Sequence, residues 1–137
     1  MMISPGIKSL GDFTITNAGT QIGEWVEGLE GLLALASQLR LAYGSGGTAI
    51  KAYLQTSLDQ GVTAIDVACF TFAMTSAVKA RNLSALTPKT ADIVLTDGAL
   101  AEDTSVDGVL GDRFRLKIVS TGTYGGSTVL SGRLVAR

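Results

Sequence analysis

The sequence contains no histidine, a single cysteine and only two prolines among its 137 residues. The lack of histidine excludes Ser-His-Asp and Cys-His catalysis, and it removes the commonest general base and the commonest zinc ligand. Because Cys69 has no second cysteine to pair with, an internal disulfide framework is excluded as well. We therefore expect a protein that is not an enzyme and that needs no cofactor.

Charge is also scarce and balanced, with 11 basic and 12 acidic residues. Because no run of Lys or Arg occurs, nothing indicates a nucleic-acid partner. No apolar stretch reaches the length of a membrane span, so no membrane role is expected. Only 17% of the residues are charged, which suits a protein that buries part of its surface against partners, the alternative being a compact monomer with a Ser/Thr surface.

The 17 glycines cluster between alternating apolar segments, a pattern typical of strands joined by turns. Residues 29–43 also fit one helical face, but Gly28 and Gly31 discourage a helix start there and favour a strand from Leu33. We predict an irregular arm at 1–11 and one all-β domain at 12–137. Strands are predicted at 11–17, 20–27, 33–43, 49–57, 63–71, 76–83, 91–95, 113–120 and 127–136.

Two hairpins are expected among these strands. One joins 49–57 to 63–71, and the other joins 113–120 to 127–136 across Tyr124-Gly125-Gly126. The segments 39–48 and 116–128 resemble each other, since each has an alternating strand, a tyrosine and a Gly-rich turn before the next strand. Short strands with frequent turns favour a β-sandwich, with a jelly roll as the preferred topology.

The candidate chemical residues all have structural explanations. Cys69 lies inside an apolar strand and is expected to be a small buried side chain. The Gly-rich turn at 44–48 lacks the lysine and the helix of a phosphate-binding loop. Five acidic residues in the loop 96–112 are weak calcium candidates: Asp97, Glu102, Asp103, Asp107 and Asp112. The alternative is a solvated loop with Asp-Gly turns, and a glycosidase pair lacks an aromatic sugar platform.

The segment Ser57-Leu58-Asp59-Gln60-Gly61-Val62-Thr63 resembles the Asp-box, Ser-x-Asp-x-Gly-x-Thr-Trp, of sialidases and other β-propellers. In such a turn Asp59 accepts backbone N–H bonds, Gly61 takes a positive φ, and Ser57 and Thr63 flank them. The Trp of that pattern is replaced here by Ala64. One copy cannot build a propeller, so we interpret the segment as a structural turn.

A wider pattern includes this turn. The stretch from Ile50 to Gly61 contains Gln55-Thr56-Ser57-Leu58-Asp59 and leads to Ile65-Asp66-Val67. Gly111-Asp112-Arg113-Phe114-Arg115-Leu116-Lys117 follows near the end, before Ser120-Thr121-Gly122-Thr123-Tyr124. Over about residues 45–137 this layout resembles small virion proteins of tailed bacteriophages, and among them the jelly-roll cement (decoration) proteins of capsids.

The resemblance implies a jelly roll that oligomerises, often as a trimer, and clamps neighbouring major capsid subunits. The expected location is the virion, after assembly in the host cytoplasm. The N-terminal arm is a candidate clamp that orders on binding, with Met1, Met2, Ile3, Pro5 and Ile7 as its assembly residues, and the alternative is simple terminal disorder. A tail or head–tail connector component is the nearest alternative. A carbohydrate-binding module is another, and its aromatic side chains would come from Trp25, Tyr43, Tyr53 and Tyr124.

Overall fold

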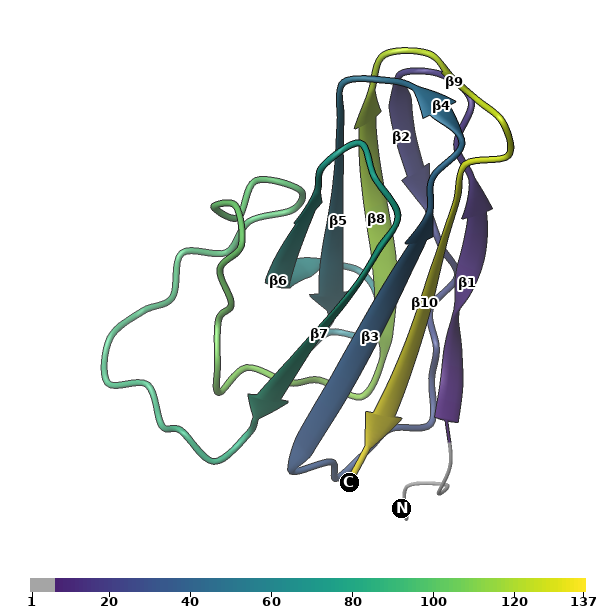
Figure 1. The fold of residues 1–137 in the computed structure, drawn as a ribbon. Coiled ribbons are helices and arrows are strands. Elements are labelled where there is room, and N and C mark those ends of the chain that lie inside the picture. Colours follow the sequence, from purple (N-terminus) through teal and green to yellow (C-terminus); the bar gives the residue numbers. More distant parts are fainter. Residues whose placement is uncertain (1–6) are drawn as a thin grey trace.

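The computed structural model describes residues 7–137, and within them it contains strands, turns and loops but no helix (Figure 1). The prediction of an all-β fold is confirmed. The strands are β1 (Ile7–Thr14), β2 (Gly19–Ile22), β3 (Ala34–Ala42), β4 (Ser45–Gly46), β5 (Ala49–Thr56), β6 (Ile65–Phe72), β7 (Ala77–Ser84), β8 (Phe114–Thr121), β9 (Tyr124–Gly125) and β10 (Val129–Ala136).

The strands form a sandwich of two four-stranded antiparallel sheets. Sheet A has the order β1-β10-β3-β7, and sheet B has the order β2-β8-β5-β6. The two-residue strands β4 and β9 pair separately. Among the eight longer strands, every connection passes from one sheet to the other except the β5–β6 hairpin. That hairpin is where the sequence predicts it.

Alternating apolar residues explain why these strands form two layers. In β3, Leu35, Leu39 and Leu41 are buried, whereas the residues between them on the other face are exposed. This period of two matches a strand with one covered face, so the strand interpretation of 33–43 is confirmed and the helical one is wrong. The largest side chains buried between the sheets include Phe70, Phe114, Leu54, Leu116 and Leu130.

The predicted N-terminal arm is wrong in its second half. Residues 7–14 form β1, which pairs with β10 along its length. A register shift between Ser9 and Gly11 breaks the alternation there, which hides the strand in the sequence. Ile7 is thus part of sheet A and 71% exposed, whereas the other predicted arm residues, Met1, Met2, Ile3 and Pro5, lie outside the described residues.

The predicted C-terminal hairpin is also wrong, because β8 belongs to sheet B and β10 to sheet A. Their connection, 122–128, carries β9, which pairs with β4 in the matching connection 43–48. The two segments that resemble each other in sequence are therefore two crossings between the sheets that pair with each other. A Cβ on Gly46 would lie 2.3 Å from the Thr123 carbonyl oxygen, so glycine permits this close approach.

Two further strand predictions need correction. The strand at 20–27 ends at Ile22, although Gly23 and Val26 continue to hydrogen-bond to β8 through Leu116 and Phe114. The step from Gly23 to Val26 is three positions, whereas the step between their partners on β8, Leu116 and Phe114, is two, which is the spacing of a bulge. Residues 91–95 form no strand, and all of 85–113 is loop apart from an isolated bridge at Ser105.

The two ends of the sandwich differ in their connections. At the end that we call the strap end lie the short connections 15–18, 43–48, 73–76 and 122–128. At the opposite end, which we call the loop end, lie 23–33, 57–64 and 85–113. The first described residue and the C-terminus are at the loop end too (Figure 1).

Candidate functional site

The turn at 57–64 has the geometry predicted for it. The Asp59 carboxylate accepts the Thr63 N–H at 2.7 Å and the Ser57 hydroxyl at 2.8 Å, and Ser57 Oγ accepts the Gly61 N–H at 2.8 Å. Gly61 has a φ of 91°. Hydrogen bonds from the Thr63 hydroxyl and N–H, and then from Ser57, hold the pKa of Asp59 below its ordinary value. These contacts are internal to the turn.

A tryptophan packs on this turn, although it comes from a distant segment. Trp25 Nε1 would lie 3.2 Å from a Cβ added to Gly61. The guanidinium of Arg115 lies 4.4 Å from the centre of the indole ring, within the range of a cation–π contact. Trp25 thus packs against this turn. In an Asp-box the turn is anchored by a tryptophan at the position that Ala64 occupies here.

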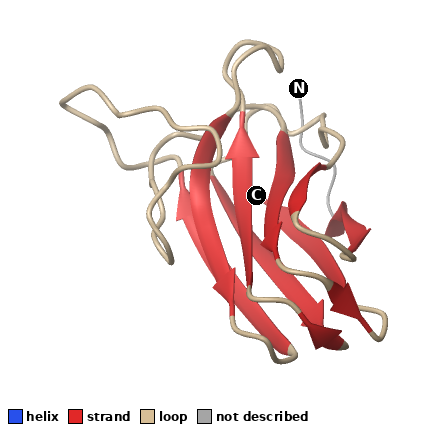
Figure 2. Ribbon diagram, turned by 90° about the horizontal axis from the view of Figure 1, so that it is seen from above, coloured by secondary structure: helices blue, strands red, loops and turns tan. Residues whose placement is uncertain are grey.

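The β6 edge of sheet B is covered by the loop 85–113, which stands beside β6 and β7 (Figures 1 and 2). Its backbone pairs with the edge of β6: Asp66 N–H donates to Thr96, Cys69 N–H to Thr104, and Val106 N–H to Val67. Because an open strand edge attracts other chains, this loop protects β6 from such pairing.

Asp66 is the main anchor of the loop and is only 2% exposed. Its carboxylate accepts the backbone N–H groups of Gly98, Ala99 and Leu100 at 2.7 to 3.2 Å, and the Thr96 hydroxyl at 2.8 Å. A buried carboxylate is tolerated where such donors surround it. The sequence does contain a signal for it, an acidic residue within the apolar run Ile65-Asp66-Val67, but only the structure identifies the donors.

Gln55, on β5, joins Asp66 to a wider polar network. Its amide donates to Asp66 at 2.9 Å and to Asp97 at 2.6 Å, and its carbonyl oxygen accepts from Arg115 Nε at 2.9 Å. Lys117 pairs with Asp97 at 3.0 Å. The network therefore continues through Arg115 to Trp25, linking the loop 85–113 to the turn at 57–64.

The acidic loop residues predicted as weak calcium ligands do not converge. Among residues 7–137, no group of three or more His, Cys, Asp or Glu side chains is placed to hold a metal ion. Each candidate instead has its own partners: Lys117 and Gln55 for Asp97, Lys51 for Glu102, Thr71 for Asp103, Ser84 and Thr87 for Asp107, and Arg113 for Asp112.

We expect these partners to make the loop sensitive to acid. The Thr71 hydroxyl lowers the pKa of Asp103, and the Ser84 N–H lowers that of Asp107, below the ordinary 3.8. A carboxyl group whose pKa falls on folding stabilises the folded state above its unfolded pKa, and this stability disappears as the pH falls through the folded value. The thermal midpoint should be flat down to about pH 5 and should fall below about pH 4.

The control is the double variant Asp103→Asn and Asp107→Asn. It should melt at a lower temperature at neutral pH and show a shallower decrease in acid, because the titrating groups are gone. An unchanged acid slope in this variant would show that other groups govern the loop.

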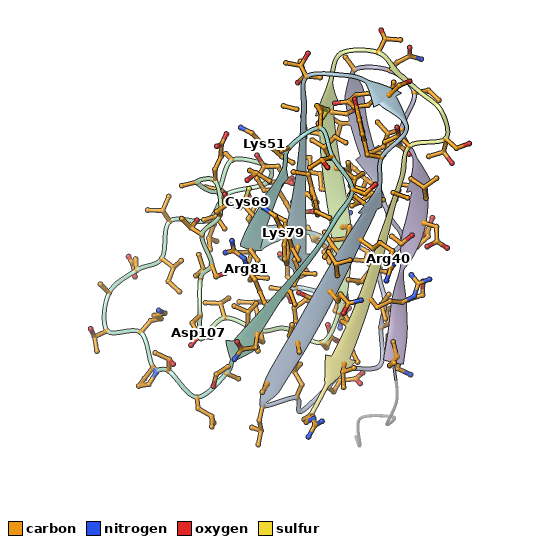
Figure 3. The ribbon with its side chains drawn as sticks, in the orientation of Figure 1. Arg40, Lys51, Cys69, Lys79, Arg81 and Asp107 are labelled. Atoms are coloured by element: carbon orange, nitrogen blue, oxygen red, sulfur yellow. The ribbon has the colours of Figure 1, made fainter. Side chains whose placement is uncertain are left out.

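Cys69 lies under the same loop and is fully buried, as the sequence predicts. Burial raises the pKa of its thiol, so the thiolate is disfavoured. Its N–H donates to Thr104 of the loop, and Figure 3 labels its position beside β6.

The four aromatic side chains considered for sugar binding are dispersed. Tyr53 and Tyr124 are buried, and the Tyr124 hydroxyl donates to Ala49 and Thr121. Trp25 is at the loop end, whereas Tyr43 is at the strap end with its hydroxyl bonded to Gly46. They do not form one exposed aromatic face.

Exposed apolar side chains are concentrated at the loop end. Only Ile22 and Val78, among the large exposed apolar residues of 7–137, lie elsewhere. The others are Ile7, Leu33, Leu58, Val62, Leu86, Val94 and Leu95. Val62 is 86% exposed and Val94 84%. This end is the candidate functional surface, because exposed apolar residues gathered on one side mark a site of interaction.

No family model matches the sequence. No curated protein shows significant similarity to it. Within residues 7–137, the structure contains no helix long and apolar enough to span a membrane.

Proposed function

We propose that this chain is a non-enzymatic structural subunit of a tailed-phage virion, and specifically a capsid decoration protein that binds between major capsid subunits. The observation that carries the proposal is the concentration of exposed apolar side chains at the loop end. A surface of this kind is stabilised by burial against a partner, at about 25 cal/mol per Å² of apolar area.

The topology supports the same proposal. Strand orders of β1-β10-β3-β7 and β2-β8-β5-β6, with all but one connection crossing between sheets, suit a jelly roll built from two Greek keys. Jelly rolls recur in viral capsid proteins. We infer a homo-oligomer, with a trimer as the form that the resemblance to cement proteins suggests.

The test is co-expression with the major capsid protein encoded in the same genome, followed by sedimentation of the assembled particles. The wild-type chain should sediment with them. Leu58→Asp combined with Val62→Asp should reduce binding at least tenfold, because two charges would be buried at the interface. Both residues are on the exposed turn tip, so the fold should remain intact.

Ile22→Asp is the matched control, since Ile22 is 53% exposed but lies on β2. It should bind particles as the wild type does. If the wild type did not sediment with capsids, or if the Leu58 and Val62 variant bound normally, capsid decoration through this end would be excluded.

The closest alternative is a tail or head–tail connector component, which would sediment with tails or with portal-containing heads instead. A carbohydrate-binding module is less well supported, because its four candidate aromatic residues are spread over both ends and the interior.

A further inference from the structure

The outer edge of β7 offers unpaired backbone groups. The N–H of Ala85 donates to the carbonyl oxygen of Leu33, so these two residues form a hydrogen-bonded pair between the antiparallel strands β3 and β7. Hydrogen-bonded and non-hydrogen-bonded pairs alternate along such strands. By that alternation, the N–H and C=O groups of Val78, Ala80 and Asn82 face away from β3. The next residue with this orientation, Ser84, bonds to Asp107 and Gly108, whereas the other three have no backbone partner within residues 7–137.

A segment of matching length lies unpaired in the adjacent loop. Residues 91–95, Ala-Asp-Ile-Val-Leu, have the composition of a strand, which is why the sequence predicts one there. They form no strand, and the loop projects from the side of the sandwich (Figures 1 and 2). Val94 is 84% and Leu95 54% exposed, so this segment has strand propensity without a strand to join.

We propose that residues 91–95 of one copy add as a strand to the open edge of β7 in a second copy. Strand addition would satisfy the backbone groups of Val78, Ala80 and Asn82 and would cover Val94. This inference rests on the proposed role as an assembling virion protein and identifies the surface through which copies contact each other.

Charge favours this pairing over its alternatives. β7 carries Lys79 and Arg81 and no acidic residue. Both cations pair with the Asp103 carboxylate, at 3.8 and 3.6 Å, which leaves one net positive charge beside β7. The segment 91–95 carries Asp92 and no basic residue. Figure 3 shows both cations on the side of β7 that faces the loop. Pairing β7 with β7 would place like charges together, which destabilises adjacent strands. Within the same chain, Asp107 and Gly108 occupy this edge at Ser84.

The first test compares oligomeric state by light scattering and sedimentation velocity. Ala80→Pro removes an N–H that points away from β3, so sheet A keeps its ladder while the edge loses a donor. Val94→Pro blocks the incoming segment in the same way. Each should weaken self-association at least tenfold without lowering the thermal midpoint of the monomer. Thr90→Pro, one residue outside the segment, should associate like the wild type.

The second test is a mixed disulfide in a Cys69→Ala background. One copy carries Ala80→Cys and the other Val94→Cys, and a disulfide-linked dimer should form only when the two are mixed and oxidised. A wild-type chain that stays monomeric, proline variants that associate normally, or a single chain carrying both cysteines that bridges only within itself would each overturn the inference.

Particle binding separates this inference from the proposed function. A chain that cross-links between positions 80 and 94 but sediments with no phage particle overturns the virion role and supports the pairing. A chain that binds particles while remaining monomeric on them overturns the pairing and supports the virion role.

Discussion

Replacing Asp66 with alanine is expected to lower the free energy of unfolding by about 3–4 kcal/mol. The carboxylate accepts hydrogen bonds from three consecutive loop N–H groups, the Thr96 hydroxyl and the Gln55 amide. Removing it leaves these donors without their acceptor beneath the loop, and each unsatisfied buried group costs about 1–3 kcal/mol, part of which water entering the site recovers. Urea unfolding measures the loss.

Hydrogen exchange should localise the effect of this substitution. The backbone N–H of Cys69 donates to the loop, and that of Val106 donates to β6. These two amides should lose protection first. Asp92→Ala is the matched control, because Asp92 is exposed in the same loop, and its replacement should change stability by no more than about 0.5 kcal/mol. Equal effects of the two substitutions would mean that Asp66 does not anchor the loop.

Gly47→Ala is expected to destabilise the strap end by about 2–5 kcal/mol. Its Cβ would lie 1.9 Å from a ring carbon of Tyr124, and Gly47 has a φ of 75°. The ring would have to move, which would break the hydrogen bonds from the Tyr124 hydroxyl to Ala49 and Thr121. Overpacking costs about 1–3 kcal/mol and a left-handed alanine about 1–2 more.

Gly125→Ala is the control for this second prediction. Gly125 lies in β9 of the same strap, but a Cβ there would meet only the flexible Ser45 hydroxyl, at 3.1 Å. Thermal unfolding of the two variants should therefore differ clearly, with Gly125→Ala close to the wild type. Similar midpoints would show that the Tyr124 ring adapts without cost.

Much of the fold could be predicted because the alternation of apolar and polar residues along a strand is visible in each short segment of the sequence. The strands around Leu39 and in β8 and β10 follow from alternation. The β5–β6 hairpin follows from its turn motif, since most residues of β5 and β6 are buried and do not alternate. Sheet membership could not be predicted, since a turn such as Tyr124-Gly125-Gly126 is compatible both with a hairpin and with a crossing between sheets. Packing of the Tyr124 ring against Gly47 accompanies the crossing, and those residues are far apart in sequence.

The candidate site, like the fold, could be predicted only where its contacts join residues that are close in sequence. The bonds within the turn at Ser57 and Asp59 connect neighbours in sequence, so the motif predicts them. The sequence identifies the acidic loop residues, but their partners on β5, β6, β7 and β8 are distant in sequence. The sequence alone therefore does not distinguish a calcium site from separate anchors. The exposed apolar end needs the assembled sandwich before it can be identified.

The pairing of β1 with β10 has a consequence for biosynthesis. Ile7 lies opposite Val135, so β1 has no partner strand in sheet A until β10 has been synthesised. Sheets built from such distant pairings fold slowly, on the millisecond-to-second scale, and expose strand edges in the meantime. Completion of sheet A should therefore wait until β10 has been synthesised and has left the ribosome, and chaperone demand should be greatest just before that moment.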